Sequence, residues 1–402
     1  MLKRSTVALL LTFLCIAVLF PSLNAQTSDE KPTLKKFGSS LKRIKWDREK
    51  QTTVDTETAN GGNDADVEDV VRVKTDLVVC DVVVLDQQKR IVKDLQKDDF
   101  VVKEDGQLQT LSHFSSGEGD EIGRSIVLII DYSDSLLPYI KWTVDAAKVL
   151  VDKLRARDRM AIVTDDVELL VDFTADKVKL KKGLEALQIR AMNRRGHSDQ
   201  FTALLATTRE MFSEEDLRPI VIFQTDGDEA AFLQPPKLTS PKRRIKQYSL
   251  DYIYKAAERS RATVYTIIPG IQVMGIEQRD QLSRAKRSYE RTAAASGYSL
   301  KRLDDTEAKN WLDFLMRGQV AASGVAKLTG GWTSFLEHPD QASSIYSQIL
   351  SDIENRYVIG YYPTNKTRDG LRRRLAIQVK DHPEYVVWGR TSYFAPQPDS
   401  RP

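Results

Sequence analysis

Three oxygen-bearing side chains, Asp131, Ser133 and Ser135, stand at alternate positions directly after a short apolar run, Ile126 to Ile130. Such a run, rich in β-branched residues, is typical of a strand that is buried on both faces. Ligands of open α/β sheets bind beyond the carboxyl ends of the strands. Oxygen donors without His or Cys suit a hard cation such as Mg²⁺, Ca²⁺ or Mn²⁺. These residues therefore indicate a cation site at a strand end.

Mg²⁺ takes about six oxygen ligands, some of them waters, so further donors are expected at the ends of other strands. Thr202 begins a helix predicted over 201–212, and Asp226 follows a strand predicted over 219–224. Both would lie at the same edge of the sheet as Asp131. The predicted metal ligands are Asp131, Ser133, Ser135, Thr202 and Asp226.

The sequence offers little for catalysis at this edge. A metal-dependent hydrolase would need a nucleophile or a general base beside the metal. No Ser-His-Asp set and no Cys nucleophile can be identified, and His197 is interpreted as a solvated loop side chain. Four more acids near the same edge could be loop charges or could support the ligands: Asp165, Asp166, Asp228 and Glu229. We therefore predict no catalytic residues and a protein that is not an enzyme.

Strands and helices alternate from residue 125 onward, which predicts an α/β fold with a doubly wound, mostly parallel sheet. The predicted strands are 125–130, 159–164, 169–173, 219–224 and 263–268, with an edge strand after Gly330. The predicted helices are 139–154, 178–187, 201–212, 250–260, 311–328 and 342–354. Residues 272–313, which are polar and rich in Arg and Lys, are interpreted as an insertion over the surface.

Short strands separated by turn residues over 70–120 predict a small flanking β-sandwich. Its first part includes strands at 100–104 and 108–114 and a strand opening at Ile91. Strands at 357–361, 372–379 and 385–388 are expected to leave the α/β domain and join it. The predicted organisation is a signal peptide 1–25, a disordered linker 26–69, sandwich strands 70–120, the α/β domain 121–355, sandwich strands 356–395 and a tail 396–402.

The N-terminus predicts the compartment of this 402-residue chain. A basic start and the apolar run 7–20, followed by small residues, indicate a signal peptide cut after Ala25; an uncleaved anchor stays open. Cleavage would remove two basic residues and no acidic one, which lowers the formal net charge from +3 to +1. We therefore expect a secreted or periplasmic protein, no nucleic-acid partner, and no later membrane segment. Cys80 would be the one remaining cysteine, a buried free thiol.

The pattern of Asp131-x-Ser133-x-Ser135, Thr202 and Thr225-Asp226-Gly227 resembles the metal-ion-dependent adhesion site of the von Willebrand factor type A (VWA) domain. The resemblance covers residues 125–353. It implies that the two serines and the threonine contact the metal directly or nearly so, and that the aspartates often act through water. It also implies one coordination position left for an acidic group of a protein partner.

One departure concerns the loop before the threonine, which often reads Gly-Gly-Thr in relatives. Here it is Asp199-Gln200-Phe201-Thr202. The flanking strands extend the resemblance over about 70–395, to secreted bacterial VWFA-related proteins familiar from acidobacteria. The expected function is an extracytoplasmic binding or adhesion module that captures a protein partner through a divalent cation, Mg²⁺ in first place, which binds an acidic side chain of that partner. The alternatives are an envelope structural protein with a fold-stabilising metal and, behind it, a metal-dependent hydrolase.

Overall fold

The largest sheet of the molecule has six strands in the order β12-β11-β10-β7-β8-β9. All neighbours are parallel except β8 and β9, which confirms the predicted α/β fold with a mostly parallel sheet. The strands are β7 Arg124–Ile130, β8 Arg159–Thr164, β9 Glu168–Thr174, β10 Arg218–Gln224, β11 Thr263–Pro269 and β12 Thr333–Leu336. The computed structural model describes residues 36–47, 52–55, 77–116, 122–193, 198–213, 216, 218–233, 248–295 and 302–396.

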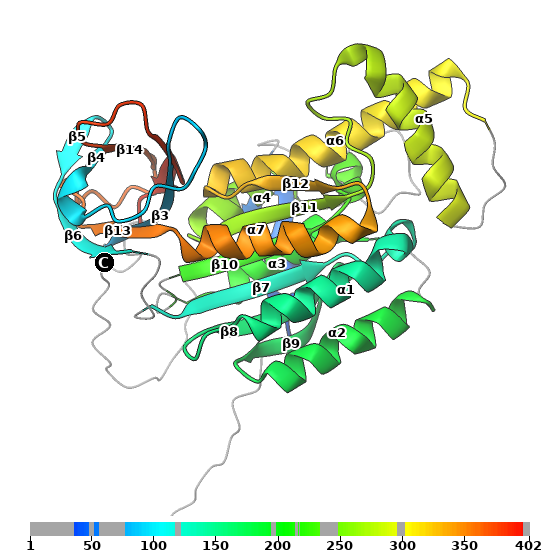
Figure 1. Ribbon diagram of the computed structural model, residues 1–402, viewed down its shortest axis with the longest axis horizontal. Helices are drawn as coiled ribbons and strands as arrows, with labels where there is room; N and C mark the ends of the chain where they lie inside the picture. The colour runs from blue at the N-terminus through cyan, green and yellow to red at the C-terminus, as the bar shows by residue number, and fades with distance from the viewer. Residues whose placement is uncertain are drawn as a thin grey trace, which may run out of the picture. The chain divides into compact units, whose positions relative to one another are not determined.

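Helices cover both faces of this sheet, and Figure 1 shows α1, α2 and α7 on the near face. The reason lies in β7, where every residue is buried and alternate side chains enter two cores. Ile126 and Leu128 pack with α1, α2 and α7, whereas Val127 and Ile129 pack with α3, α4 and α6. The helices are α1 Leu137–Asp152, α2 Lys177–Ala191, α3 Gln200–Glu210, α4 Leu250–Arg259, α5 Gln278–Ala295, α6 Asp305–Thr329 and α7 Ala342–Glu354.

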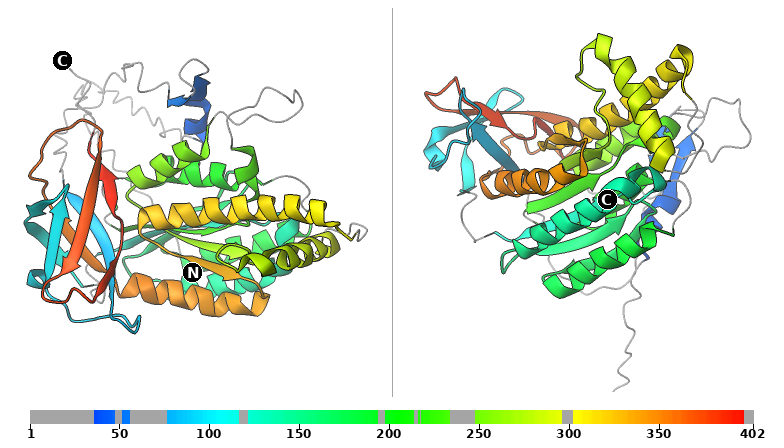
Figure 2. Two further views of the ribbon diagram at one scale, coloured as in Figure 1. Left: turned by 90° about the horizontal axis from the view of Figure 1, so that it is seen from above. Right: turned by 45° about the vertical axis from the view of Figure 1, so that its right-hand side comes forward.

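Residues 272–313, predicted to be an insertion, contain α5 and the first turns of α6 (Figures 1 and 2). Helix α6 starts earlier than residue 311 because Asp304 and Glu307 form a capping box there. The short 3₁₀ helices are η1 Ser39–Arg43, η2 Lys97–Asp99, η3 Asp134–Leu136, η4 Asp228–Phe232 and η5 Pro339–Gln341.

Two smaller antiparallel sheets, of four strands each, combine strands from before and after the α/β part. Their orders are β15-β3-β13-β6 and β16-β14-β4-β5, and both contribute side chains to one core that includes Val82, Val102 and Tyr361. Figure 2 shows the early strands in cyan beside the late ones in orange and red. The strands are β3 Val78–Leu85, β4 Phe100–Glu104, β5 Gln107–Gln109, β6 Leu111–Ser115, β13 Tyr357–Tyr361, β14 Arg372–Val379, β15 Val386–Trp388 and β16 Ser392–Phe394.

Two predictions for these small sheets were wrong in detail. The strand expected over 108–114 is divided at Thr110, because β5 pairs with β4 while β6 pairs with β13 in the other sheet. Ile91 makes one isolated bridge to Leu85 and opens no strand. The buried free thiol predicted at Cys80 is confirmed, and burial is the main reason that its pKa rises to about 12.

The linker predicted over 26–69 is wrong for the part that the structure describes. Strands β1 Ile44–Asp47 and β2 Thr52–Asp55 form a hairpin, preceded by η1. Ile44 is buried in the core on the α3 side of the large sheet. The backbone N–H groups of Gly38 and Ser40 donate to the Glu210 carboxylate at 2.8 and 2.9 Å. Three apolar side chains, Ile44 and the partly buried Phe37 and Leu41, and a few polar contacts therefore order a segment that has little hydrophobic sequence.

A buried arginine joins the small sheet that contains β3 to the α/β part. Arg356 donates to the Asp352 carboxylate at 2.8 Å, to the carbonyl oxygen of Asp81 on β3 at 3.1 Å, and to that of Gly330 after α6 at 2.8 Å. The described residues from Phe37 onward belong to one compact unit. Within the described ranges, no helix has the length and apolar character needed to cross a bilayer. The predicted signal peptide and the tail from residue 397 lie outside these ranges.

Candidate metal centre

The structure brings four of the five predicted ligands together. Asp131 follows β7 and Asp226 follows β10, and because these strands are parallel neighbours in register their ends meet. The Ser133 N–H donates to Asp131 Oδ1 at 3.0 Å, and the Ser133 and Ser135 hydroxyl oxygens lie 3.2 Å apart. The Ser135 hydroxyl donates to Asp226 Oδ2 at 2.8 Å. The side chains from two strand ends thus form one connected set of oxygens.

The fifth predicted ligand, Thr202, is engaged elsewhere. It lies in the first turn of α3, and its hydroxyl hydrogen-bonds to the Glu229 carboxylate and to the Tyr248 hydroxyl. Its backbone N–H also donates to Glu229, at 3.1 Å. The hydrogen bonds among described residues therefore tie Thr202 to Glu229 and Tyr248 rather than to Asp131 or Asp226.

Gln200 takes the position beside the carboxylates that the threonine was expected to approach. Its Nε2 lies 2.7 Å from Asp131 Oδ2, 3.1 Å from Asp226 Oδ1 and 2.7 Å from Asp228 Oδ1. Its Oε1 accepts the Glu229 N–H at 3.3 Å, which orients the amide. An amide group has two hydrogens, so it cannot satisfy three carboxylates fully. We call Asp131, Asp226 and Asp228 the carboxylate cluster.

The carboxylate cluster has too little positive charge nearby to balance its three acidic groups. Burial, and then the charge of Asp226, raise the pKa of Asp131 to about 6. Burial also raises the pKa of Asp226, and burial followed by the charges of Asp226 and Asp131 raises that of Asp228 well above its usual value. Like charges in a poorly solvated place disfavour ionisation unless a cation compensates them. The cluster is therefore electrostatically suited to a cation.

The donor chemistry supports the same fit. All the donors are carboxylate or hydroxyl oxygens, which hard divalent cations prefer. In the part of the chain that the structure describes, no three Cys, His, Asp or Glu side chains have metal-binding geometry by themselves. The predicted donor set adds the Ser133 and Ser135 hydroxyls to the carboxylates.

The acids left open by the sequence have distinct roles. Asp228 joins the carboxylate cluster, and Glu229 holds the start of α3 through Phe201 N–H at 2.6 Å and through Thr202. Asp165 accepts the Tyr132 N–H at 3.3 Å, and Asp166 accepts the Tyr132 hydroxyl at 2.8 Å. These two acids support the loop after β7. His197 lies outside the described residues.

A glycine pair lets α6 approach the loop that carries Asp226. Gly227 has φ +78°, a conformation that residues with a Cβ rarely adopt. A Cβ at Gly227 would lie 2.5 Å from the backbone oxygen of Gly318 in α6. Helix α6 therefore passes directly against the candidate site.

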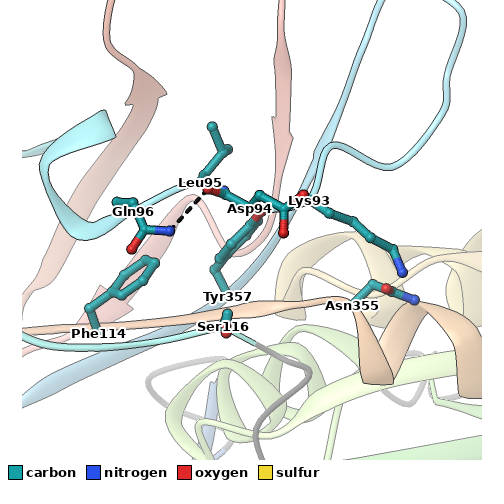
Figure 3. A pocket seen from close by; sticks show the side chains of 8 residues that line it. All are labelled: Lys93, Asp94, Leu95, Gln96, Phe114, Ser116, Asn355 and Tyr357. Carbon is teal, nitrogen blue, oxygen red and sulfur yellow. Dashed lines mark hydrogen bonds between the residues drawn. The ribbon is translucent and has the colours of Figure 1, made fainter.

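A cavity of about 190 Å³ adjoins the carboxylate cluster. Its lining includes Ser135, Asp226 and Asp228 on one side and side chains of α5 and α6 on another. A second cavity, of about 100 Å³, lies at the start of β13 between Phe114, Tyr357 and the segment around Gln96 (Figure 3). The second cavity shares no residue with the cluster, so a ligand that contacts Asp226 and Asp228 would lie in the first.

Comparisons with known proteins agree with the fold. Residues 126–229 match the family model described as von Willebrand factor type A domain, and this segment contains all five predicted ligands. The match supports a VWA domain within the α/β part of the chain. None of the curated proteins matches the chain at a significant level.

The solved structures that match the chain include three bacterial proteins. BatB from Bacteroides thetaiotaomicron is 17% identical, with 57% of this chain and 98% of that chain covered and a TM-score of 0.36. The vWF domain of the type V pili tip protein Mfa5 from Porphyromonas gingivalis is 12% identical, with 58% and 95% covered and a TM-score of 0.34. The pilus adhesin SpaC from Lactobacillus rhamnosus GG is 9% identical, with 83% and 50% covered and a TM-score of 0.35. Similarities of this size do not identify a function.

Proposed function

We propose that this chain is an extracytoplasmic binding module that holds a divalent cation at Asp131, Ser133, Ser135 and Asp226. The bound cation would supply the positive charge that attracts an acidic side chain of a protein partner. Mg²⁺ is the first candidate, with Ca²⁺ and Mn²⁺ as alternatives. Thr202, the fifth predicted ligand, would contribute only if its hydroxyl leaves Glu229 and Tyr248. A resemblance to secreted bacterial VWFA-related proteins, with a flanking β-sandwich, is part of the same proposal.

One observation carries the proposal: three carboxylates share a single neutral amide. The Gln200 side chain is their common donor, at 2.7 to 3.1 Å. Asp226 and Ser135 line a cavity, so the site can be reached by a ligand. A secreted or periplasmic location follows from the predicted signal peptide, residues 1–25, and belongs to the proposal as well.

The proposal is non-enzymatic. Hydrolysis would require a nucleophile or a general base next to the cation. Among the described residues, the hydrogen bonds of the carboxylate cluster involve Asp, Ser and Gln side chains and backbone N–H groups, and no Cys or His. An envelope structural role for the same cation would be separated from partner capture by the experiments below.

The first experiment measures cation binding. Isothermal titration of the metal-free mature chain with Mg²⁺ should give saturable binding that is abolished by Asp131→Asn. The matched control is Asp98→Asn, since Asp98 is exposed in η2, away from the cluster. Equal Mg²⁺ binding by wild type and Asp131→Asn would refute the proposed site.

The second experiment measures partner chemistry. Immobilised peptides that carry one Asp or Glu should bind the chain in the presence of Mg²⁺ and release it in excess chelator. The same peptides with Asn or Gln in place of the acid should not bind. Acid-peptide binding that is unchanged in chelator would contradict the metal bridge. A large fall in melting temperature on chelation without any peptide binding would favour the structural role.

A further inference from the structure

We infer that α5 and the first half of α6 form a pocket that selects partners in which an aromatic or large aliphatic residue directly neighbours the metal-binding acid. This inference rests on the proposed function, because it assigns the acid to the cation site. It adds a specificity that comes from α5 and the start of α6, most of which lie in residues 272–313, the segment that the sequence suggested to be a surface insertion; Phe314 follows directly after it.

The pocket is continuous with the candidate metal centre. The same cavity of about 190 Å³ is lined by Ser135, Asp226 and Asp228 and by Trp311 and Phe314 of α6. Figures 1 and 2 show α5 lying against the first part of α6. A single short peptide segment can therefore reach the oxygens with one side chain and the α6 wall with the next.

The wall beside the cluster is aromatic and fixed in place. The Trp311 and Phe314 rings stack with their centroids 5.2 Å apart, and the Tyr289 ring of α5 meets Trp311 edge-on at 5.7 Å. Stacked and edge-to-face rings of this kind hold one another in defined orientations. Such a wall favours an apolar side chain, and especially another ring, over a polar one.

The size of the cavity leaves room for one apolar side chain beside the acid. An apolar cavity of about 150 Å³ in another protein accommodates benzene, and pockets for drug-sized ligands usually exceed about 300 Å³. A cavity of about 190 Å³ therefore fits one Phe- or Leu-sized side chain next to a carboxylate group and excludes a large cofactor.

A cationic side chain completes the pocket. Arg291 of α5 lies in the lining, where its Nη1 donates to the Tyr139 hydroxyl at 3.0 Å and to the Glu337 carbonyl oxygen at 2.7 Å. Both acceptors are neutral, and among the described residues no carboxylate forms an ion pair with Arg291. By contrast, Arg284 and Lys286 of α5 pair with Glu337 and Asp305. The charge of Arg291 therefore favours an acidic peptide over a basic one.

Three labelled hexapeptides test the pocket with the mature chain in Mg²⁺, read by fluorescence anisotropy. They share Gly flanks and carry Asp-Phe, Asp-Gly or Asn-Phe at the centre. We expect Asp-Phe to bind about tenfold or more tighter than Asp-Gly, from burial of one aromatic side chain, and Asn-Phe to bind much more weakly.

Phe314→Ala should reduce the preference for Asp-Phe over Asp-Gly to less than threefold, with Asp-Gly binding changed less than twofold. Val320→Ala is the matched control, because Val320 lies on the same helix, is 49% exposed and is absent from the lining. Circular dichroism and Mg²⁺ titration check that each variant is folded and binds the cation.

The outcomes separate the two proposals. Mg²⁺-dependent binding of Asp-Phe and Asp-Gly with equal affinity would overturn the pocket while the cation site stands, as would an Asp-Phe preference retained by Phe314→Ala. An Asp-Phe preference that is lost in Phe314→Ala but persists in excess chelator would support the pocket and overturn the cation site.

Discussion

Gln200 should compete with a cation for the carboxylate cluster, so removing its amide should tighten cation binding. Its Nε2 lies within 3.1 Å of oxygens of Asp131, Asp226 and Asp228. The informative change is Gln200→Met, which keeps the length and the apolar stem of the side chain and removes the donor.

The magnitude follows from the hydrogen bonds that a cation would replace. A hydrogen bond to a charged group contributes about 1.5–3 kcal/mol. A cation held by Asp131 and Asp226 takes over oxygens that the Gln200 amide contacts, so at least one such bond is lost on binding. Gln200→Met removes that competition, and the Kd for Mg²⁺ should fall by roughly 10- to 150-fold.

The assay is isothermal titration of metal-free protein with Mg²⁺, with thermal melting of the metal-free form alongside. Metal-free Gln200→Met should melt below wild type, because the three carboxylates lose their shared donor, and Mg²⁺ should stabilise it more than it stabilises wild type. Gln107→Ala, an exposed change on β5, is the control. An unchanged or larger Kd in Gln200→Met would refute the reasoning, and a larger Kd would assign the amide oxygen as a ligand.

Three further changes test the surrounding structure. Thr202→Val should destabilise the fold by about 1–3 kcal/mol in urea unfolding, because a buried carboxylate loses its hydroxyl donor, yet should change the Mg²⁺ Kd less than threefold. Burial raises the pKa of Asp158, but the hydrogen bonds from Arg124 and Arg155 and the charge of Arg124 together outweigh it and hold that pKa below its usual value. The stability that this gives is therefore present above about pH 4 and is lost as the pH falls further, so Asp158→Asn should flatten the acid side of a stability profile measured from pH 3 to 7. Gly227→Ala should lower the free energy of unfolding, measured in urea, more than Gly106→Ala does. Both glycines have a positive φ, but only at Gly227 would a Cβ meet backbone atoms, 2.5 Å away. Equal losses of unfolding free energy would contradict the close approach of α6.

The fold could be predicted from the sequence because its strongest signals are local. The strands β7, β10 and β11 are buried along their whole length and consist mainly of apolar residues. Helix α7 and strand β13 have the predicted bounds, since turn residues separate them clearly. The N-terminal hairpin escaped prediction because its order depends on Glu210 and the α3 face, which are far away in the sequence.

The candidate site was predictable only in part, for a similar reason. Asp131, Ser133, Ser135 and Asp226 meet because two neighbouring parallel strands end together, which the pattern of strands already indicates. The hydroxyl of Thr202 bonds to Glu229 of η4 and to Tyr248, and no local sequence pattern predicts these two hydrogen bonds. Gln200 carries no charge and belongs to no ligand motif. The only sequence feature that pointed to it was the replacement of the usual Gly-Gly before Thr202 by larger residues.

The buried Arg356 has a consequence for how the chain melts. The protein has separate cores in the α/β part and between the two small sheets, and two cores ordinarily permit two transitions. Arg356 is bonded to the last turn of α7, to β3 and to the turn after α6, so neither part can unfold without leaving a buried guanidinium partly unsatisfied. Heating should therefore give one cooperative calorimetric peak, and Arg356→Met should split it into two.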